Sequence, residues 1–222
     1  MATYSIREQS KDKTKETSKT GLILCLIIVL VLLMGAAYVA YKHQLTGLQA
    51  RLFYDIDNLN LTSGGTVAAK WITEGLGAGY PIAACVIIPA LFKNFRLSWR
   101  FLVTIGGAFL LAEVLKYAVK EPRPIAMLRG HLHQRVIETG PGFPSGHEAA
   151  ATAMALTLWF LLPPRWRWVS VVWIAVVAFS RLYLGVHTPV DIFGGFAVGL
   201  LAVCVVRLLP PSIAKPLRLN ED

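Results

Sequence analysis

Long uncharged apolar runs alternate with short polar segments along the chain. Gly21–Tyr41 holds 21 residues without a charge and Gly75–Phe92 holds 18. At a rise of about 1.5 Å per helical residue, runs of this length can cross the hydrocarbon core of a bilayer, which is about 30 Å thick. Together with four shorter runs, the pattern predicts six membrane-spanning helices. The expected spans are about 21–41, 75–93, 99–119, 147–163, 168–186 and 190–209.

The fold class that follows is all-α, a single six-span membrane bundle over residues 21–209. Residues 1–20 are polar and of mixed charge, which predicts a mobile cytoplasmic tail, and residues 210–222 form a second cytoplasmic tail. The first run has the basic flank of a signal peptide and, in Gly35-Ala36-Ala37, a passable cleavage site. Its apolar core is longer than that of a signal peptide and further spans follow, so we interpret it as an uncleaved anchor.

Between the first two spans, apolar residues recur at helical spacing and predict an amphipathic helix. These positions are Leu45, Leu48, Leu52, Ile56 and Leu59. Such a helix can lie on the outer surface of the bilayer or pack across the outer mouth of the bundle. The sequence leaves both placements open.

Composition supports the membrane assignment. Of the 222 residues, 55% are hydrophobic and 16% are charged, whereas a soluble domain carries about a quarter charged residues. The net charge of +9 does not indicate nucleic acid, because the basic residues lie between the spans and not in one patch. Cys25, Cys85 and Cys204 all fall inside apolar runs, which indicates small buried side chains and not a disulfide framework or a metal site.

The distribution of Lys and Arg predicts the orientation. With the N-terminus inside and six spans, 13 of the 22 Lys and Arg residues lie on the cytoplasmic side. Without Lys116, Arg123 and Arg181, which belong to the motifs below, the bias is 13 to 6. The positive-inside rule therefore places both termini in the cytoplasm. The ionisable residues at the span ends then gather on the outer face, where they mark a functional site.

Three blocks within residues 116–191 bring polar groups to the span ends. They are Lys116 with Arg123-Pro124, then Pro144-Ser145-Gly146-His147, and then Ser180-Arg181 with His187 and Asp191. A transferring phosphoryl group spreads negative charge over its oxygens, and positioned cations stabilise it. Arg123 and Arg181 can each offer a planar fork to two oxygens, and Lys116 adds a point charge. Ser145 and Gly146 precede a span, where the free N–H groups of a helix start point at an anion.

The histidines supply a nucleophile and an acid. His187 lies four residues before Asp191, and Pro189 suits the first position of a helix. Asp191 can then accept a hydrogen bond from the imidazole, which fixes the tautomer and frees the other ring nitrogen to attack phosphorus. His147, placed separately, can protonate the leaving oxygen.

These blocks resemble the type 2 phosphatidic acid phosphatase (PAP2) superfamily, whose pattern is Lys-x6-Arg-Pro, Pro-Ser-Gly-His and Ser-Arg-x5-His-x3-Asp. Every element is present, in order, over about residues 99–209. The resemblance implies a six-helix membrane fold and hydrolysis of a lipid phosphate or diphosphate through a phosphohistidine, without metal or other cofactor. It implies His187 as nucleophile, Asp191 as its partner and His147 as general acid. The implied phosphate-binding residues are Lys116, Arg123, Ser145, Gly146 and Arg181.

The expected protein is a bacterial plasma-membrane phosphatase with an outward-facing site, acting on undecaprenyl (polyprenyl) diphosphate. Alternative substrates are phosphatidylglycerophosphate, phosphatidic acid or a prenyl-linked sugar phosphate. A lipid-binding or transport protein on the same scaffold is the alternative from another class. His147, His187 and Asp191 oppose it, because a binding protein needs cations but no nucleophile. The expected partners are the lipid substrate and the bilayer, with no nucleic acid, and the oligomeric state stays open.

Two acidic residues beside the motifs have alternative roles. Glu113 lies three residues before Lys116 and can pair with Lys116 or with Lys120. Glu148 follows His147, where it favours a helix start or contacts the substrate headgroup.

We interpret residues 125–143 as a loop facing the headgroups. His131 and His133 lie within it, but two histidines are too few to predict a metal site.

Overall fold

The computed structural model describes residues 2–42, 45, 47–59, 61–77, 79–128, 133 and 135–209, and for residues 2–18, 79 and 81 it describes the backbone alone. Every regular element in these ranges is a helix, which confirms the all-α prediction. The elements are α1 (Ala2–Tyr41), α2 (Gly47–Asp57), α3 (Ser63–Gly77), α4 (Gly79–Leu91), α5 (Phe95–Val119), α6 (Pro124–Met127), α7 (Gly146–Trp159), the 3₁₀ turn η1 (Pro164–Trp166), α8 (Trp168–Tyr183) and α9 (Pro189–Leu208).

Three helical segments are long and apolar enough to cross a membrane: Lys19–Tyr41 in α1, Phe95–Met127 across α5 and α6, and Pro189–Leu208 in α9. The pair α3 and α4 adds a fourth if it forms one span bent by 45°. α7 has 14 residues and α8 has 16. At about 1.5 Å per residue these two reach about 21 and 24 Å, short of a hydrocarbon core of about 30 Å. Within the described ranges three or four spans meet the criterion, so the count of six stays a prediction.

The polar segment ahead of the first apolar run is helical and continuous with it. α1 begins at Ala2 and not near residue 21, so a helix stands where we expected an irregular tail. The segment holds four Lys and two Glu, which favour helix although they are polar. The lack of apolar periodicity before residue 21 therefore does not mean that this segment is non-helical.

If α3 and α4 form one span, that span begins at Ser63 and not near residue 75. α3 carries Lys70 and Glu74, so no uncharged run marks its beginning. Thr73 lies between them in the sequence and is buried against the bundle. A helix of the bundle that carries exposed charged side chains can therefore be longer than its charge-free run.

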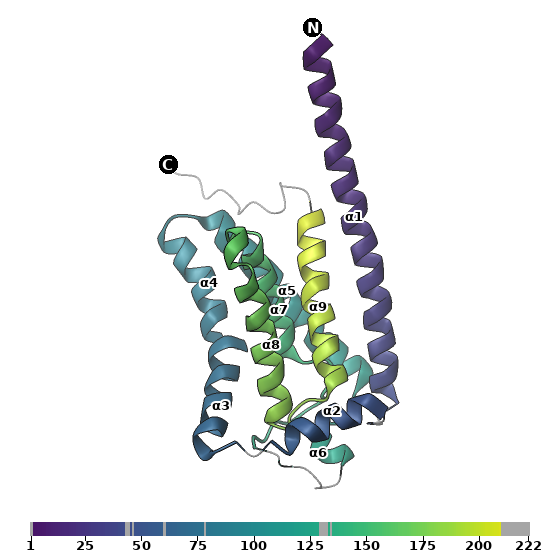
Figure 1. Cartoon of the computed structure of the whole chain (residues 1–222), viewed down its shortest axis with the longest axis vertical. Coiled ribbons are helices and arrows are strands. Elements are labelled where there is room, and N and C mark those ends of the chain that lie inside the picture. The colour runs from purple at the N-terminus through teal and green to yellow at the C-terminus, as the bar shows by residue number, and fades with distance from the viewer. Residues whose placement is uncertain are drawn as a thin grey trace.

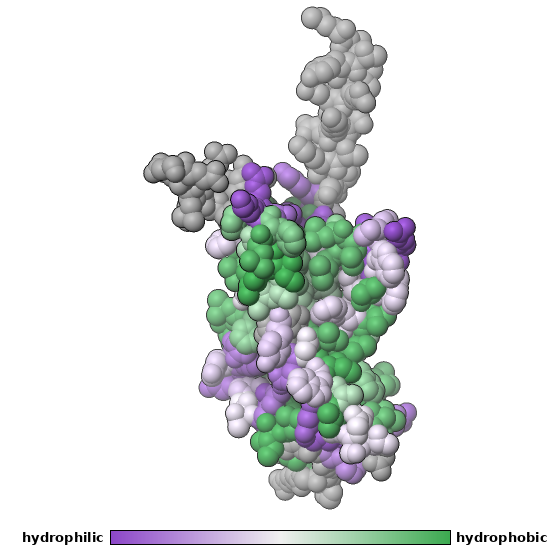
Figure 2. Space-filling view, turned by 90° about the vertical axis from the view of Figure 1, so that its left-hand side faces the viewer, coloured by the Kyte–Doolittle hydropathy of each residue, from purple (hydrophilic) through white to green (hydrophobic). Residues whose placement is uncertain are grey.

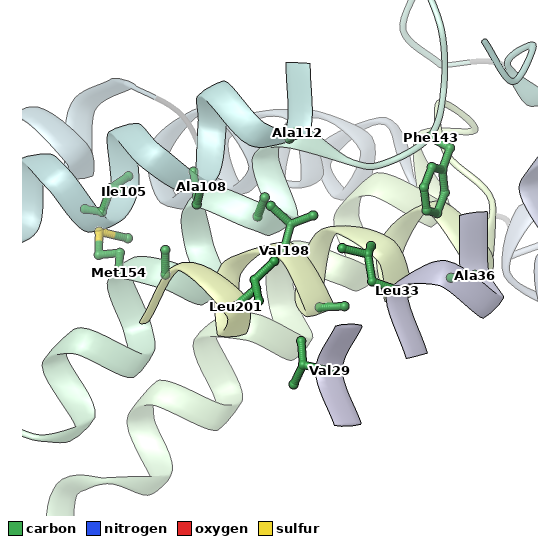
Figure 3. Close-up of a cluster of buried hydrophobic side chains, with 14 of the residues drawn as sticks. Val29, Leu33, Ala36, Ile105, Ala108, Ala112, Phe143, Met154, Val198 and Leu201 are labelled. Carbon is green, nitrogen blue, oxygen red and sulfur yellow. The ribbon is translucent and has the colours of Figure 1, made fainter. Parts of the chain in front are cut away.

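The helices stand side by side, with α9 between α1 and α7 (Figure 1), and α9 also packs against α5. Their buried apolar side chains form one cluster, part of which Figure 3 shows. Leu33 of α1, Ala108 of α5 and Val198 of α9 belong to it. Its members on α7 are small, including Ala149, Ala150 and Ala153.

Glycines allow α9 to approach α7 closely. A Cβ atom at Gly195 would lie 2.5 Å from the carbonyl oxygen of Ser145 and 2.8 Å from the Cβ of Glu148. At Gly199 it would lie 2.6 Å from the carbonyl oxygen of Ala149. Small residues at such a crossing let two backbones come together in a membrane. This crossing fixes the start of α7 relative to the start of α9.

The amphipathic helix α2 packs across the ends of α8 and α9 and also keeps an apolar face exposed. Phe53 and Asp57 are buried, whereas Leu48 and Leu52, which belong to the apolar stripe, are 72% and 44% exposed. Figure 1 shows α2 lying crosswise below these helix ends. α2 packs across the mouth of the bundle, with Ile56 of the stripe against a buried cluster and Leu48 and Leu52 facing outward. Contact of this exposed side with the bilayer surface stays a prediction.

The two ends of the bundle differ. The C-terminal ends of α5 and α8 meet the N-terminal ends of α7 and α9 at the lower end of Figure 1. Figure 2 shows one face of the molecule, with hydrophobic residues covering its upper part and hydrophilic residues gathered lower down. On α3, Lys70 and Glu74 are exposed.

Candidate active site

All eight residues predicted to act on a phosphate lie at this lower end. They are Lys116 in the last turn of α5, Arg123 at the N-cap of α6, Ser145 at the N-cap of α7, Gly146 and His147 in the first turn of α7, Arg181 in the last turn of α8, His187 between α8 and α9, and Asp191 in the first turn of α9. Antiparallel helices bring the three sequence blocks together, as their positions at the span ends predicted.

His187 is held by the start of α9. Thr188 caps this helix: its Oγ1 accepts from the Asp191 N–H at 3.2 Å, and its own N–H donates to Asp191 Oδ2 at 2.8 Å. The same Oδ2 lies 3.3 Å from His187 Nδ1, and both side chains are buried. Burial lowers the pKa of His187 to about 4, although the hydrogen bond to Asp191 opposes this. At pH 7 the imidazole is neutral, and with the proton on Nδ1 its Nε2 carries a free lone pair.

Arg123 fixes the other side of His187. Its Nη1 lies 3.5 Å from His187 Nε2 and donates to the carbonyl oxygen of Val186 at 2.9 Å. Its Nε donates to the carbonyl oxygen of Gly140 at 3.2 Å, and Nη2 donates to that of Thr139 at 3.4 Å. The guanidinium therefore joins the segment before α7 to the α8–α9 turn and places a fixed cation beside Nε2.

Glu138 bridges the two arginines, and the sequence analysis missed it. Its Oε2 lies 2.9 Å from Arg123 Nη1, and its Oε1 accepts from Arg181 Nη2. Arg181 Nη1 donates to Thr73 Oγ1 at 3.1 Å. Burial alone raises the pKa of Glu138, but the charge and hydrogen bond of Arg181 lower it to about 2. An ionised carboxylate therefore lies between the two cations. The only signal in the sequence is that Glu138 is the single acidic residue of residues 125–143.

The start of α7 receives Lys116 from α5. A Cβ at Gly146 would lie 3.6 Å from Lys116 Nζ, so the lysine reaches the first turn of the helix. Ser145 Oγ accepts from the Glu148 N–H at 3.4 Å, and the Ser145 N–H donates to the Asp191 carbonyl oxygen at 3.0 Å. The hydroxyl therefore caps α7, and the predicted phosphate contact of Ser145 stays a prediction.

His147 lies where α3 gives way to α4. A Cβ at Gly77 would lie 3.3 Å from the His147 Cβ, so glycine allows α3 to pass close to this residue. The charges of Arg181, Glu138 and Lys116 act on the His147 ring. His147 therefore lies within electrostatic reach of Arg181 from the first turn of α7, whereas His187 lies in the turn between α8 and α9.

The two acidic residues beside the motifs have structural contacts. Glu113 Oε1 lies 2.6 Å from Lys116 Nζ, which confirms the predicted ion pair and chooses Lys116 over Lys120. Glu148 is fully buried, with Oε1 accepting from Thr152 Oγ1 at 3.3 Å. Because Glu148 points into the bundle, the suggestion that it contacts a headgroup was wrong.

Glu121 is a second missed residue. It is buried, and its carbonyl oxygen accepts from the Gly142 N–H at 2.8 Å. A Cβ at Gly142 would lie 3.2 Å from Asp191 Oδ2, so this segment passes directly beside Asp191. Glu121 is therefore a buried carboxyl group in the chain that passes beside Asp191.

Arg135 anchors the segment that precedes Glu138. Its Nη1 donates to the Tyr183 carbonyl oxygen at 2.6 Å and lies 3.2 Å from Asp57 Oδ1. The guanidinium also lies over the Tyr183 ring, 4.1 Å from its centroid. Asp57 further accepts from the His133 N–H at 3.1 Å. These contacts join three parts of the chain: α2, the segment that precedes α7, and α8. No sequence motif predicted them.

Within the described residues no group of three or more His, Cys, Asp or Glu side chains is placed to hold a metal ion. Of the two histidines considered earlier, His131 lies outside the described residues and His133 Nδ1 lies 3.2 Å from Asp57 Oδ2. A reaction without metal stays a prediction.

Buried cations, a histidine–carboxylate pair and apolar helices define a membrane protein with a cluster of charged and ionisable groups at one end of its bundle. The sequence profile of the PAP2 superfamily matches residues 97–213, more than half of the chain. The chain belongs to the PAP2 superfamily.

Relatives agree with this assignment. The chain is 34% identical to phosphatidylglycerophosphatase B of Bacillus subtilis over 161 residues, covering 64% of this chain and 76% of that protein. It is 31% identical to an undecaprenyl-diphosphatase of Sulfolobus acidocaldarius over 121 residues, covering 54% of this chain but only 57% of that protein. The crystal structure of a transmembrane PAP2-type phosphatidylglycerolphosphate phosphatase from Bacillus subtilis superposes with a TM-score of 0.65 at 27% identity, covering 82% of this chain and 94% of that one.

Proposed function

We propose that the protein is a membrane lipid phosphatase that works through a phosphohistidine at His187. The observation that carries the proposal is the buried His187–Asp191 pair, whose free Nε2 lies 3.5 Å from Arg123 Nη1. A neutral imidazole oriented by a carboxylate is an activated nucleophile, and a binding protein has no need of one. Membership of the PAP2 superfamily supports the same chemistry.

In the first step the phosphoryl group of the lipid lies between Arg123, Arg181 and the start of α7. His187 Nε2 attacks phosphorus, and the bond from phosphorus to the leaving oxygen breaks. The guanidinium groups stabilise the charge that develops on the oxygens. Arg181 Nε is a buried donor with no partner among the described residues, and it is available to a phosphate oxygen.

His147 completes both halves of the reaction. In its cationic form His147 donates a proton to the leaving oxygen, and the leaving group departs as a lipid alcohol or a lipid monophosphate. The neutral His147 then takes a proton from water, and the hydroxide formed attacks the phosphohistidine. Inorganic phosphate leaves, and His187 and the protonated His147 are restored. Asp191 holds the His187 ring throughout.

The substrate we propose is a polyprenyl diphosphate such as undecaprenyl diphosphate. The support is the relative named undecaprenyl-diphosphatase, together with the apolar helices that suit a lipid substrate held in the bilayer. Phosphatidylglycerophosphate is the second candidate, because relatives named phosphatidylglycerophosphatase B match over more of their length, 76% and 78%.

We further propose six spans in a bacterial plasma membrane, both termini in the cytoplasm and the site on the outer face. The support is the Lys and Arg bias of 13 to 6 toward the N-terminal side. In a cysteine-free background, a membrane-impermeant thiol reagent should label Ile137→Cys in intact cells but not Arg96→Cys. Both positions are exposed and lie at opposite ends of the bundle. Labelling of Arg96→Cys alone would place the site in the cytoplasm.

Phosphate release by purified protein tests the proposed activity. The panel holds undecaprenyl diphosphate, phosphatidylglycerophosphate, phosphatidic acid and a prenyl-linked sugar phosphate, each with and without EDTA. We expect the highest kcat/KM with undecaprenyl diphosphate and no loss of rate with EDTA, because the arginines take the place of a metal. A preference for phosphatidylglycerophosphate would make that lipid the first candidate substrate. Loss of rate with EDTA that one divalent ion restores would refute the metal-free route.

A further inference from the structure

The two arginines that bind substrate in the proposed function already hold an anion from this chain. The Glu138 carboxylate contacts Arg123 Nη1 with one oxygen and Arg181 Nη2 with the other. The same Arg123 Nη1 lies 3.5 Å from His187 Nε2. A planar anion spanning both guanidinium groups beside Nε2 occupies the place that a phosphoryl group needs, so substrate must displace Glu138 to react.

The backbone on both sides of Glu138 is anchored, so the segment that carries this residue is held in place. On one side Arg135 is fixed to Asp57 and to the Tyr183 carbonyl oxygen. On the other side the carbonyl oxygens of Thr139 and Gly140 accept hydrogen bonds from Arg123. Glu138 is 24% exposed whereas Arg181 is 1% exposed. An incoming anion can therefore reach the carboxylate and move this one side chain aside while the arginines stay in position.

The exchange favours anions according to their charge. The two guanidinium groups carry two positive charges, and Glu138 neutralises one of them. A phosphodiester with a single negative charge gains little by replacing a carboxylate of equal charge. A phosphate monoester dianion or a terminal diphosphate brings more charge to the same pair of cations and gains attraction. Specificity of this kind depends on a built-in competitor as well as on favourable contacts.

We propose that Glu138 is a specificity-determining residue that admits phosphoryl groups carrying two or more negative charges and excludes phosphodiester monoanions. Most phospholipid headgroups of a bilayer are phosphodiesters with one negative charge on the phosphate. A site that opens into the membrane meets them in large excess over any lipid monophosphate or diphosphate. Glu138 keeps the arginines occupied against the abundant lipids and yields to the substrate. This inference rests on the proposed function, which assigns Arg123 and Arg181 to the phosphate.

Anion binding by the full-length protein in detergent tests this role without requiring turnover. Calorimetric dissociation constants are measured for inorganic phosphate and for dimethyl phosphate, a diester monoanion, in the wild type and in Glu138→Gln. We expect the wild type to bind inorganic phosphate and to show no measurable binding of dimethyl phosphate. Either anion displaces the same carboxylate, so Glu138→Gln should bind both about tenfold more tightly, a change of about 1.4 kcal/mol, and binding of dimethyl phosphate should become measurable. Glu74→Gln is the matched control, because Glu74 acts on Arg181 through space and does not bridge the arginines, and its affinities for both anions should match those of the wild type.

Two outcomes decide against the inference. Unchanged or weaker binding of both anions by folded Glu138→Gln would make Glu138 an arginine-positioning residue only. If Glu138→Gln does not fold, Glu138→Asp keeps the charge but shortens its reach, and it should tighten the binding of both anions partly; unchanged affinities there would also refute the inference. Binding as expected with no phosphate released from any lipid would overturn the proposed function and leave the charge selection of Glu138 standing.

Discussion

Protein with alanine in place of His187 is expected to lose about 10⁴-fold or more in kcat with every lipid phosphate, as is typical when a covalent nucleophile is removed. No other imidazole in the described residues combines a carboxylate partner with a ring nitrogen beside a buried arginine. Phosphate release by the purified variant measures the loss. Near-normal turnover would show that the covalent route is wrong.

Two further variants separate chemistry from packing. His187 is buried, so alanine also leaves a cavity, and His187→Gln keeps more of the volume. Both variants should lose activity while their unfolding temperatures differ. His147→Ala should slow the release of a lipid alcohol but largely spare the first release of p-nitrophenol from p-nitrophenyl phosphate, because that leaving group needs no proton. An equal loss of rate in this first step with both substrates would remove His147 from the role of general acid.

Gly195→Val is expected to have the second-largest effect. Its Cβ would lie 2.5 Å from the Ser145 carbonyl oxygen, which is backbone and has little freedom to move aside. α7 and α9 must then separate, which costs about 1–3 kcal/mol or more of stability. The separation also strains the hydrogen bond of 3.0 Å from the Ser145 N–H to the Asp191 carbonyl oxygen. Displacing His147 from His187 by about 1 Å should reduce kcat by about 10²-fold.

Thermal unfolding in detergent and phosphate release measure these two losses. Gly106→Val on α5 is the matched control, since a Cβ there meets nothing within 4 Å. It should leave the unfolding temperature and kcat close to those of the wild type. If Gly195→Val behaved like Gly106→Val, the close approach of α7 and α9 would not be what aligns the two histidines.

The sequence predicted the gathering of the site because helical spans leave few places for charged residues. Residues that break apolar runs must lie at span ends, and alternating spans bring those ends together in two groups. The geometry of His187 and Asp191 followed from local rules as well. Pro189 suits the first helical position, and it places Asp191 in the opening turn, where the carboxylate reaches back to the imidazole.

The residues that were missed lie where no periodic rule applies. Glu138 and Glu121 sit in irregular chain. Glu138 meets Arg123, which lies 15 residues before it, and Arg181, which lies 43 residues after it. Nothing in the spacing of single carboxylates indicates which arginine they meet. The helix α3, which precedes the predicted start of the second span, was missed for another reason. Lys70 and Glu74 interrupt the apolar run that marks a lipid-facing helix.

The central claim is that a phosphoryl group passes through His187, and trapping that intermediate tests it most directly. His147→Ala turned over with p-nitrophenyl phosphate labelled at phosphorus should accumulate protein-bound phosphate, because without the base water attacks the phosphohistidine less readily. The account predicts a burst of about one p-nitrophenol per active site and a label that survives alkali, is lost in acid and maps to His187 by mass spectrometry. A label that persists when His187 is also replaced by alanine, or turnover with no burst and no bound phosphate, would contradict it.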